Sequence, residues 1–162
     1  MAAPDSESCE RIKKILLEEQ NRIRLSPQVE HERKAALFDL IDENYFAPVG
    51  GLRGPYILHL GTDGERLTFR VCDEEDHFLT RFVLPLGIFR SIVKDYFLVC
   101  DNYFKSIKTA SPSRIEAIDM GRRALHNQGA ELLRAKLADK VDIDLDTARR
   151  LFTLVCVLHI RR

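Results

Sequence analysis

The spacing of apolar residues changes twice along this chain, and the change limits the folds that the chain can adopt. Between residues 56 and 84 apolar and polar residues alternate, as in half-buried strands, whereas on either side apolar residues recur every three or four positions. Asp63-Gly64 separates two of the alternating runs and is a strong hairpin signal. A third run, 77–84, follows the acidic turn 73–76. The pattern predicts a three-stranded antiparallel meander flanked by helices.

Helical spacing is found on both sides of the meander. The segments are 30–45, a long helix from Leu86 to about Ile107, a helix that begins at Ser111-Pro112, and a last element over 147–159 capped by Asp144 or Asp146. Asn127-Gln128-Gly129 either ends the third of these or only weakens it before 130–137 continues. Segment 11–20 fits a helix and a strand equally, and the Pro- and Gly-rich stretch 47–55 reads as a loop.

These elements predict an α+β fold, in which a small three- to four-stranded antiparallel sheet packs against a predominantly helical C-terminal half. Residues 1–10 are polar and small, so we expect a disordered tail there and a single α+β domain over 11–162. A chain of 162 residues that is 45% hydrophobic and 31% charged is long enough to bury one core.

The composition excludes several classes of protein. The N-terminus lacks the basic and apolar regions of a secretory signal, and the longest apolar run is far short of the roughly 18 residues that cross a bilayer, so we expect no membrane partner. The four cysteines form no CxxC pair, which disfavours zinc-ribbon, iron–sulfur and thioredoxin-like sites. Reduced thiols indicate a cytoplasmic location. We expect no cofactor, since phosphate-loop and dinucleotide motifs are both missing.

Charge is balanced overall but uneven along the chain. Residues 1–80 carry 10 basic and 16 acidic side chains, and residues 81–162 carry 15 and 9. The two halves either neutralise each other when they pack, or leave a basic surface on the second half for an acidic partner. With zero net charge, no tryptophan and no basic run longer than a pair, we expect no nucleic-acid partner.

A polar stripe on the third predicted helix carries the densest group of functional residue types. Spacings of three and four place its members on one side of the helix: Asp119, Arg122, Arg123, His126 and Asn127. A carboxylate, guanidinium groups and an imidazole within two turns can bind an anion or adjust a histidine for acid–base work. The alternative is an Asp119–Arg123 ion pair with only a structural role. Ala117, Gly121 and Ala124 form a smooth side beside the stripe, where we expect another element to approach closely.

Secondary candidates lie outside this stripe. His31-Glu32-Arg33 opens the first helix but is not a zincin motif, because Ala35 stands where the second histidine would be. Arg53, in a glycine-rich loop, is a weak candidate for anion binding. The basic pair Arg149-Arg150 begins the last element.

The cysteines allow two interpretations. Cys100 and Cys156 lie in apolar runs, where a thiol usually behaves as a small buried hydrophobic group. The functional alternative is a redox switch that uses Cys72, Cys100, Cys156 or the N-terminal Cys9. Cys156 and His159 would share a helix face as half of a metal site, and no other half is evident in the sequence. Only folding could assemble a ligand set that includes His59, in a predicted strand, or His77, at a turn, so we predict no metal site.

Long segments of the sequence resemble a family of short alphaproteobacterial proteins of uncharacterised activity. The likeness covers about residues 28–160 and is carried by EHER (30–33), FAPVGG (46–51), IVKDYFLVCDNYF (92–104), IEAIDMGRRALHNQGAELL (115–133) and DLDTARRLFTLVCVLH (144–159). The resemblance implies a cytosolic alphaproteobacterial protein and supplies no catalytic residues, because no activity is established for the family.

Three functional hypotheses follow. The leading one is a non-enzymatic regulatory or adaptor protein that binds another protein, or a second copy as a homodimer, through its helical half. The second is a small anion-binding protein or hydrolase-like enzyme centred on His126, with Arg123 or Arg53 holding the anion, and it requires a pocket within reach of His126. The third is a thiol-based redox regulator. Missing nucleophile motifs make an enzyme the less favoured reading.

Overall fold

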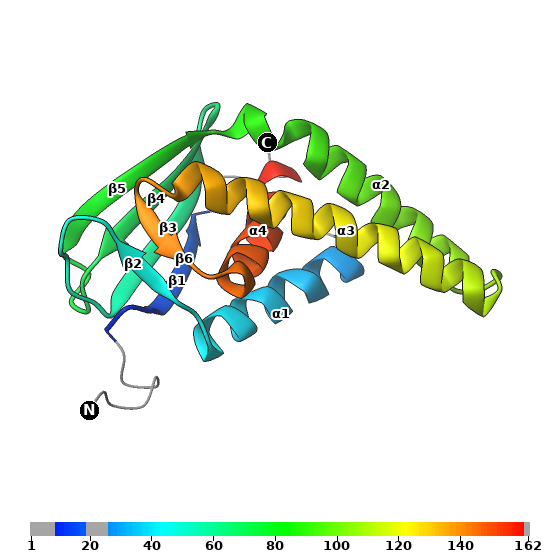
Figure 1. Cartoon of the computed structure of the whole chain (residues 1–162), viewed down its shortest axis with the longest axis horizontal. Coiled ribbons are helices and arrows are strands. Elements are labelled where there is room, and N and C mark those ends of the chain that lie inside the picture. Colours follow the sequence, from blue (N-terminus) through cyan, green and yellow to red (C-terminus); the bar gives the residue numbers. More distant parts are fainter. Residues whose placement is uncertain (1–8, 19–25, 161–162) are drawn as a thin grey trace.

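Among the residues that the structure describes, four strands form the main sheet, and four α-helices lie to one side of it (Figure 1). The computed structural model describes residues 9–18 and 26–160. The sheet has the order β1 (Ile12–Glu18), β3 (Tyr56–Asp63), β4 (Arg66–Cys72) and β5 (Phe78–Pro85). The α+β class is therefore confirmed. The predicted tail over 1–10 lies largely outside the described residues, and it stays a prediction together with the single domain.

Strands β3, β4 and β5 form the predicted antiparallel meander. Gly64 turns the β3–β4 hairpin with φ of +62°, a conformation that glycine adopts without steric cost. The alternation of the sequence places the side chains of Leu58 and Val71, which are paired across the strands, in the core. The opposite face carries His59 and its cross-strand neighbour Arg70.

Strand β1 lies parallel to β3, so the sheet is mixed, and the antiparallel prediction fails for this one edge. The sequence left this segment undecided between helix and strand, and no local pattern encodes its partner. Asn44, just beyond α1, holds the start of β1: its side chain accepts from the amide of Ile12 (2.7 Å) and donates to the carbonyl of Ile12 (2.9 Å). These long-range bonds fix a strand that the local sequence leaves ambiguous.

Two short strands lie apart from the main sheet. Strand β2 (Phe46–Pro48) pairs antiparallel with β6 (Val141–Ile143), although the sequence predicted a loop for most of β2 and gave no strand at β6. Each strand has three residues, which is too short for a periodic signal, and their pairing joins parts of the chain about ninety residues apart.

Most of the remaining described residues lie in helices, and most of these helices match the expected segments. They are α1 (Pro27–Asp42), the short 3-10 helix η2 (Leu86–Phe89), α2 (Arg90–Ser106), α3 (Pro112–Leu137) and α4 (Leu145–Ile160). Ser111 caps α3 by accepting a hydrogen bond from the amide of Arg114 (3.3 Å), and Asp144 accepts from the amide of Thr147 (2.8 Å) at the start of α4. Among the described residues, no helix is both long and apolar enough to cross a membrane.

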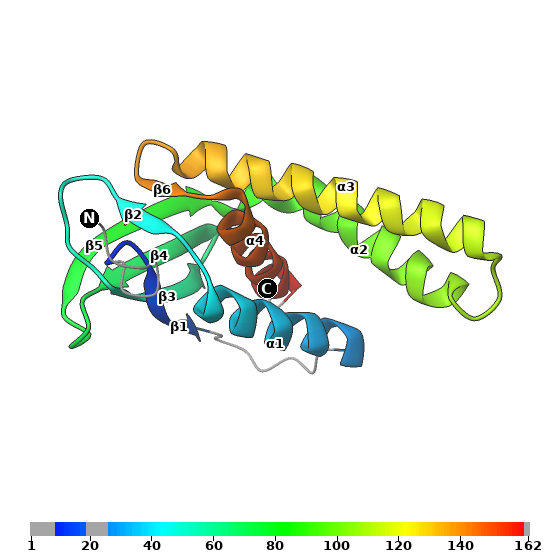
Figure 2. The ribbon, with the colours of Figure 1, turned by 60° about the horizontal axis from the view of Figure 1, so that its bottom comes forward.

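Helix α4 is the centre of the helical layer. Its apolar residues occupy almost every face, and nine of its sixteen residues are buried. It packs against α1, α2 and α3 (Figure 2). Helices α2 and α3 lie side by side as an antiparallel pair that extends well beyond the sheet (Figures 1 and 2).

The close approach of α3 to another element occurs at Gly129, not at the smooth side predicted around Gly121. Ala117, Gly121 and Ala124 are all exposed, and a Cβ built on Gly121 would meet no described atom within 4 Å. A Cβ on Gly129 would lie 2.2 Å from the ring of Phe152 on α4. Helix α3 runs unbroken through Asn127-Gln128-Gly129, so Gly129 does not end the helix. The missing side chain at this position instead lets α3 pack closely against Phe152 of α4.

The two glycines of α3 make a matched pair for a stability measurement. Gly129→Ala should lower the free energy of unfolding by about 1–3 kcal/mol, because the methyl group overlaps a buried ring. Gly121→Ala should raise it by about 0.5–1 kcal/mol, because alanine is the better helix former at an open position. Urea denaturation of the two variants measures both effects, and a gain in stability at Gly129 would contradict the packing described above.

Candidate functional site

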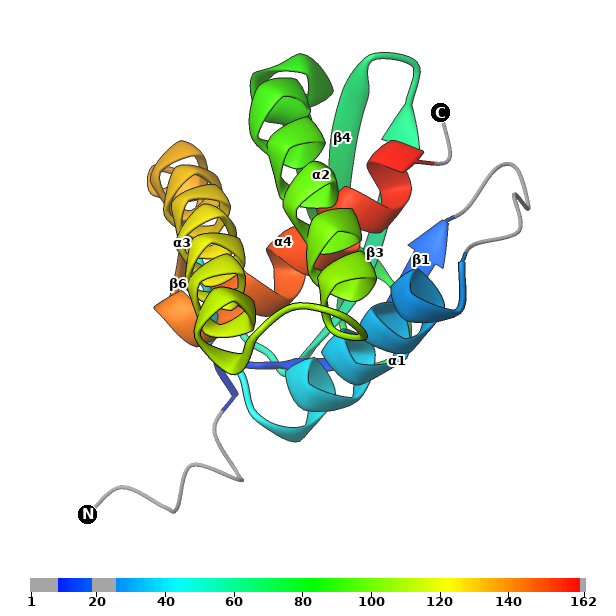
Figure 3. The same cartoon turned by 90° about the vertical axis from the view of Figure 1, so that its right-hand side faces the viewer.

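A cleft of about 520 Å³ opens on the helical side of the molecule, and all four α-helices contribute to its walls. This volume is in the range of small-molecule sites. The lining residues are Glu32, Ala35, Ala36 and Asp39 of α1, Tyr96 of α2, Arg122, Arg123, His126 and Asn127 of α3, and Arg149, Arg150 and Thr153 of α4. Figure 3 shows α1, α2 and α3 arranged around α4.

The helical repeat explains why these side chains meet. The α1 residues are spaced 32, 35, 36, 39, and the α3 residues 122, 123, 126, 127, so each set forms one face of its helix. The α4 residues 149, 150 and 153 have the same spacing. Four of the five residues of the predicted stripe line the cleft, and they meet a second basic pair on α4.

Arg122 is the most constrained cation of the cleft. Its Nε and Nη2 donate to Asp119 Oδ1 at 3.1 and 2.6 Å, and its Nη1 lies 3.8 Å from Glu32 Oε1 across the cleft. The guanidinium also lies over the ring of Tyr103, 5.1 Å from its centroid. Asp119, the fifth residue of the stripe, thus acts as the anchor of Arg122 from behind the cleft wall.

Each of the other three arginines is also held by a neighbour. Arg123 pairs with Asp119 Oδ2 at 2.7 Å, and its side chain remains 73% exposed. Arg149 donates through Nε to Asn127 Oδ1 (2.7 Å) and through Nη1 to Asp146 Oδ1 (3.0 Å). Arg150 donates to the backbone carbonyl of Glu43 at 2.7 Å. A guanidinium has five N–H donors, so these contacts orient the arginines and leave donors for a ligand.

The lining of the cleft is positively charged. It holds four arginines and two carboxylates, those of Glu32 and Asp39, while Asp119 and Asp146 contact the arginines without lining the cleft. Burial raises the pKa of Glu32, an effect that the nearby Arg122 partly opposes. The hydrogen bond from Arg122 is the main reason that the pKa of Asp119 is lowered, so this anchor is ionised at neutral pH.

His126 is partly buried and forms part of the cleft wall. Its Nε2 lies 2.8 Å from Thr153 Oγ1, and that hydroxyl donates to the backbone carbonyl of Arg149 at 3.3 Å. Because the threonine has a single hydroxyl proton, the imidazole donates from Nε2 to the hydroxyl oxygen. Tyr96 and Phe152 contact the ring, with centroid separations of 5.4 and 5.5 Å.

Three effects keep this imidazole neutral. Burial lowers the pKa of His126 to about 4, with further contributions from the positive charges of Arg149 and Arg122. A general base works best with a pKa close to the working pH, so His126 is a weak proton acceptor at neutral pH. The described cleft lining also holds no cysteine, and its one threonine is already hydrogen-bonded to its own helix. These features fit binding of an anion better than acid–base catalysis.

The structure brings some secondary candidates into the cleft and leaves others outside it. Glu32, Arg149 and Arg150 line the cleft. His31 and Arg53 are exposed and do not line it, and Arg33 pairs with Glu30 at 3.5 Å on α1. Arg53 therefore does not hold an anion together with His126.

Sequence reasoning missed Tyr96, Asp39 and Thr153. Tyr96 was counted among the apolar residues of α2, and its hydroxyl in fact lies 3.4 Å from Glu32 Oε2. Thr153 sits inside the apolar run of the last helix, where its position one turn after Arg149 was the only available signal. The meeting of α1 with α3 and α4 is a tertiary contact that no single-helix pattern contains.

Three of the four cysteines named as redox candidates are buried, and Cys9 is partly exposed. Cys72, Cys100 and Cys156 are all free thiols with little or no exposure. Burial raises the pKa of Cys100 to about 11, and it also raises those of Cys72 and Cys156. A protonated, enclosed thiol reacts slowly, so these features do not support the redox hypothesis, which stays a prediction. Cys156 and His159 do not belong to either cluster of metal-ligand types found among the described residues.

Replacing His126 with glutamine should flatten the dependence of folding stability on pH. Between about pH 6.5 and 4, His126 binds a proton in the unfolded protein but stays neutral in the folded protein. The free energy of unfolding of the wild type should therefore lose nothing to His126 above pH 6.5. It should fall by about 2 kcal/mol as the pH drops toward 4, after allowance for the partial exposure of His126. Urea denaturation at several pH values measures the slope.

His77→Gln is the matched control, because the side chain of His77 is 76% exposed. It should keep the wild-type slope between pH 6.5 and 4. Equal slopes for the wild type and His126→Gln would show that His126 is not held neutral by the fold.

Comparison with known proteins agrees with the resemblance noted in the sequence. A relative from Paramagnetospirillum magneticum is 55% identical over 152 residues, covering 94% of this chain and 97% of the relative. A relative from Rhizobium etli is 53% identical over 138 residues (85% and 88%), and one from Rhodopseudomonas palustris is 50% identical over 159 residues (98% and 96%). No solved structure matches the chain. Residues 9–161 match the family described as "Uncharacterised protein family (UPF0262)", and the chain belongs to this family, whose relatives named above are alphaproteobacterial.

Proposed function

We propose that this protein binds a small anionic ligand, one that carries phosphate or carboxylate groups, in the cleft between α1, α3 and α4. The observation that carries the proposal is the meeting of four arginines from two helices on one cleft of about 520 Å³. Planar guanidinium groups suit the paired oxygens of phosphates and carboxylates, and they are less strongly hydrated than lysine ammonium groups.

Preorganisation supports the same proposal. Asp119 fixes Arg122 and Arg123, and Asp146 with Asn127 fixes Arg149, so less side-chain freedom is lost when a ligand binds. The α1 wall carries the acidic residues Glu32 and Asp39, so it differs chemically from the arginine-rich walls of α3 and α4. A ligand with an anionic group against α3 and α4, and a hydroxyl or amino group facing α1, would match both sides.

Binding is favoured over catalysis in this proposal. The cleft wall is a recognition surface made of four guanidinium groups, the Asn127 amide and a neutral imidazole, which donates a hydrogen bond to Thr153. No activated nucleophile is found among the described residues that line it. A regulatory role would act through such a ligand. The protein partner and the cytoplasmic location inferred from the sequence remain predictions that the cleft neither requires nor opposes.

Inorganic phosphate, pyrophosphate and citrate are suitable probes for isothermal titration calorimetry, with sorbitol as a neutral control. Pyrophosphate should bind more tightly than phosphate, because its second phosphoryl group adds negative charge and further acceptor oxygens for the arginines of α3 and α4. Arg149→Gln should weaken binding by about tenfold or more, since a hydrogen bond to a charged group is worth about 1.5–3 kcal/mol. Raising the salt concentration should also weaken binding.

Arg114→Gln is the matched control, because Arg114 is exposed on α3 and does not line the cleft. It should leave the affinity unchanged, and Arg149→Lys should fall between the wild type and Arg149→Gln because it keeps the charge but loses the paired donors. No saturable binding of any of the three anions, or equal losses for Arg114→Gln and Arg149→Gln, would refute the proposal.

A further inference from the structure

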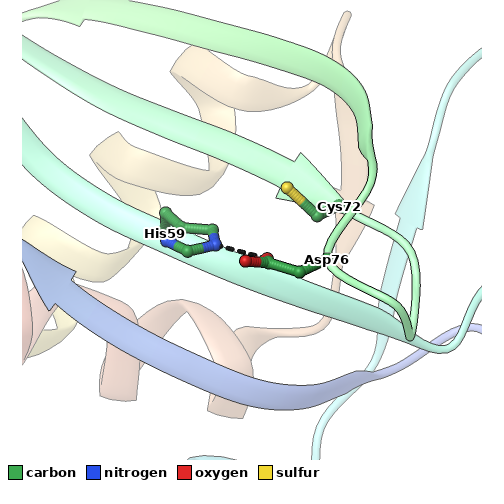
Figure 4. Close-up of side chains that lie close together, drawn as sticks. All are labelled: His59, Cys72 and Asp76. Atoms are coloured by element: carbon green, nitrogen blue, oxygen red, sulfur yellow. Dashed lines mark hydrogen bonds and ion pairs between the residues drawn. The ribbon is translucent and has the colours of Figure 1, made fainter.

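A second cluster of functional side chains lies on the sheet, well away from the cleft. His59 of β3, Cys72 at the end of β4 and Asp76 of the β4–β5 turn point toward one another (Figure 4). One potential ligand atom from each residue lies within 4.8 Å of the other two. The cluster combines an imidazole nitrogen, a sulfur and a carboxylate oxygen, the three kinds of donor that proteins use to bind zinc.

The strand register places two members of the cluster on one face. Ile57 pairs with Cys72 and His59 pairs with Arg70, so His59 and Cys72 are diagonal neighbours on the face opposite to the core residues Leu58 and Val71. This face does not form part of the arginine cleft. The cluster therefore forms independently of the proposed anion site.

The turn after β4 brings in the third member. Asp73 Oδ1 accepts hydrogen bonds from the amides of Glu75 and His77, both at 2.9 Å, which shapes the turn. Asp76 adopts a positive φ of 65°, a conformation uncommon for residues other than glycine. Its carboxylate folds back over the sheet, and Oδ1 lies 2.7 Å from His59 Nε2.

His59 also has a carboxylate on its other side. Its Nδ1 lies 3.3 Å from Oε1 of Glu18, the last residue of β1. A histidine that binds a metal through one nitrogen usually donates from the other to a carboxylate or a carbonyl, which fixes the ring and makes it a better ligand. Glu18 is positioned for this role, and His59 itself is buried, so the ring orientation is well defined.

We propose that His59 Nε2, Cys72 Sγ and a carboxylate oxygen of Asp76 bind a divalent transition-metal ion of the zinc type, with Glu18 as the outer partner of His59. Three protein ligands leave a fourth tetrahedral position for water or a further ligand. A thiol and an imidazole select such ions over magnesium and calcium, which prefer oxygen. The sequence alone predicted no metal site, because local patterns indicate the strands and turns but not the direction of the Asp76 side chain, which places its Oδ1 beside His59 Nε2.

The distances are compatible with an ion after a small adjustment. Zinc–nitrogen bonds of about 2.0 Å and zinc–sulfur bonds of about 2.3 Å place two ligands about 3.5 Å apart in a tetrahedron. A pair of ligand atoms at the limit of 4.8 Å must therefore approach by about 1.3 Å, whereas His59 Nε2 and Asp76 Oδ1, now 2.7 Å apart, must separate by about 0.6 Å. The side chain of Asp76 is 51% exposed and can rotate, whereas His59 and Cys72 are held by the strands. On binding, the thiol proton of Cys72 is released to solvent, and the imidazole carries its one proton on Nδ1, toward Glu18, so that Nε2 is free to bind the ion.

Cobalt is the most direct probe, because a cobalt–thiolate bond gives a charge-transfer absorption in the near ultraviolet. Titration of the full chain with Co²⁺ under reducing conditions should give this band with one ion per chain, and Zn²⁺ should displace the cobalt and abolish the band. Cys72→Ser should abolish it in Co²⁺ titrations, and His59→Gln should weaken Zn²⁺ binding, measured by competition with a chromogenic chelator, by at least tenfold. Glu18→Gln should weaken it by about tenfold, as is usual for outer partners.

Cys9→Ser is the matched thiol control, because Cys9 is the least buried cysteine among the described residues, and it should leave both the band and the affinity unchanged. Asp76→Asn tests the site with little risk of misfolding, because the Asp76 side chain is half exposed. This variant should weaken Zn²⁺ binding while its circular dichroism spectrum stays as in the wild type. Absence of the thiolate band in the wild type, or its persistence in Cys72→Ser, would overturn the proposal. Neither result would affect the anion titrations, since the two sites share no residue.

Discussion

The contact between Gly129 and Phe152 is the constraint on which the helical half depends. A Cβ at position 129 would overlap the phenylalanine ring, so α3 and α4 come this close only because the glycine has no side chain. Phe152 also lies near His126 and Tyr96, with centroid separations of 5.5 and 6.4 Å. The same ring thus joins the hydrophobic core to the wall of the cleft.

This close packing explains how a cleft with four cations can form in a folded protein. The helices α3 and α4 bring Arg122, Arg123, Arg149 and Arg150 to one place, and Asp119 and Asp146 compensate part of the positive charge from outside the lining. Burial beside these cations is also what keeps His126 neutral, so the histidine serves as a hydrogen-bond donor in the wall.

The two proposed sites lie on different layers of the fold. The anion cleft is built from helix faces, and the metal cluster is built on the sheet face that points away from those helices. They are joined through the core, because β3 and β4 present Leu58 and Val71 to the same cluster of buried residues that contains Phe152. Each site uses polar residues that the fold holds in place through turns, caps and ion pairs.

Local patterns in the sequence determined most of the secondary structure and one wall of the cleft. The Asp63-Gly64 hairpin, the Ser111 cap and the stripe from Asp119 to Asn127 follow from turn chemistry and the helical repeat, which act over a few neighbouring residues. Only the tertiary structure decided that β1 runs parallel to β3, that β2 pairs with β6, and that α1 and α4 complete the cleft. It also decided that Gly129 packs against α4 while Gly121 faces open space, and that His59, Cys72 and Asp76 converge. The physical reason is the same in each case: these contacts join residues far apart in the chain, and their free energy comes from burial and hydrogen bonds that exist only once the helices and strands have packed together.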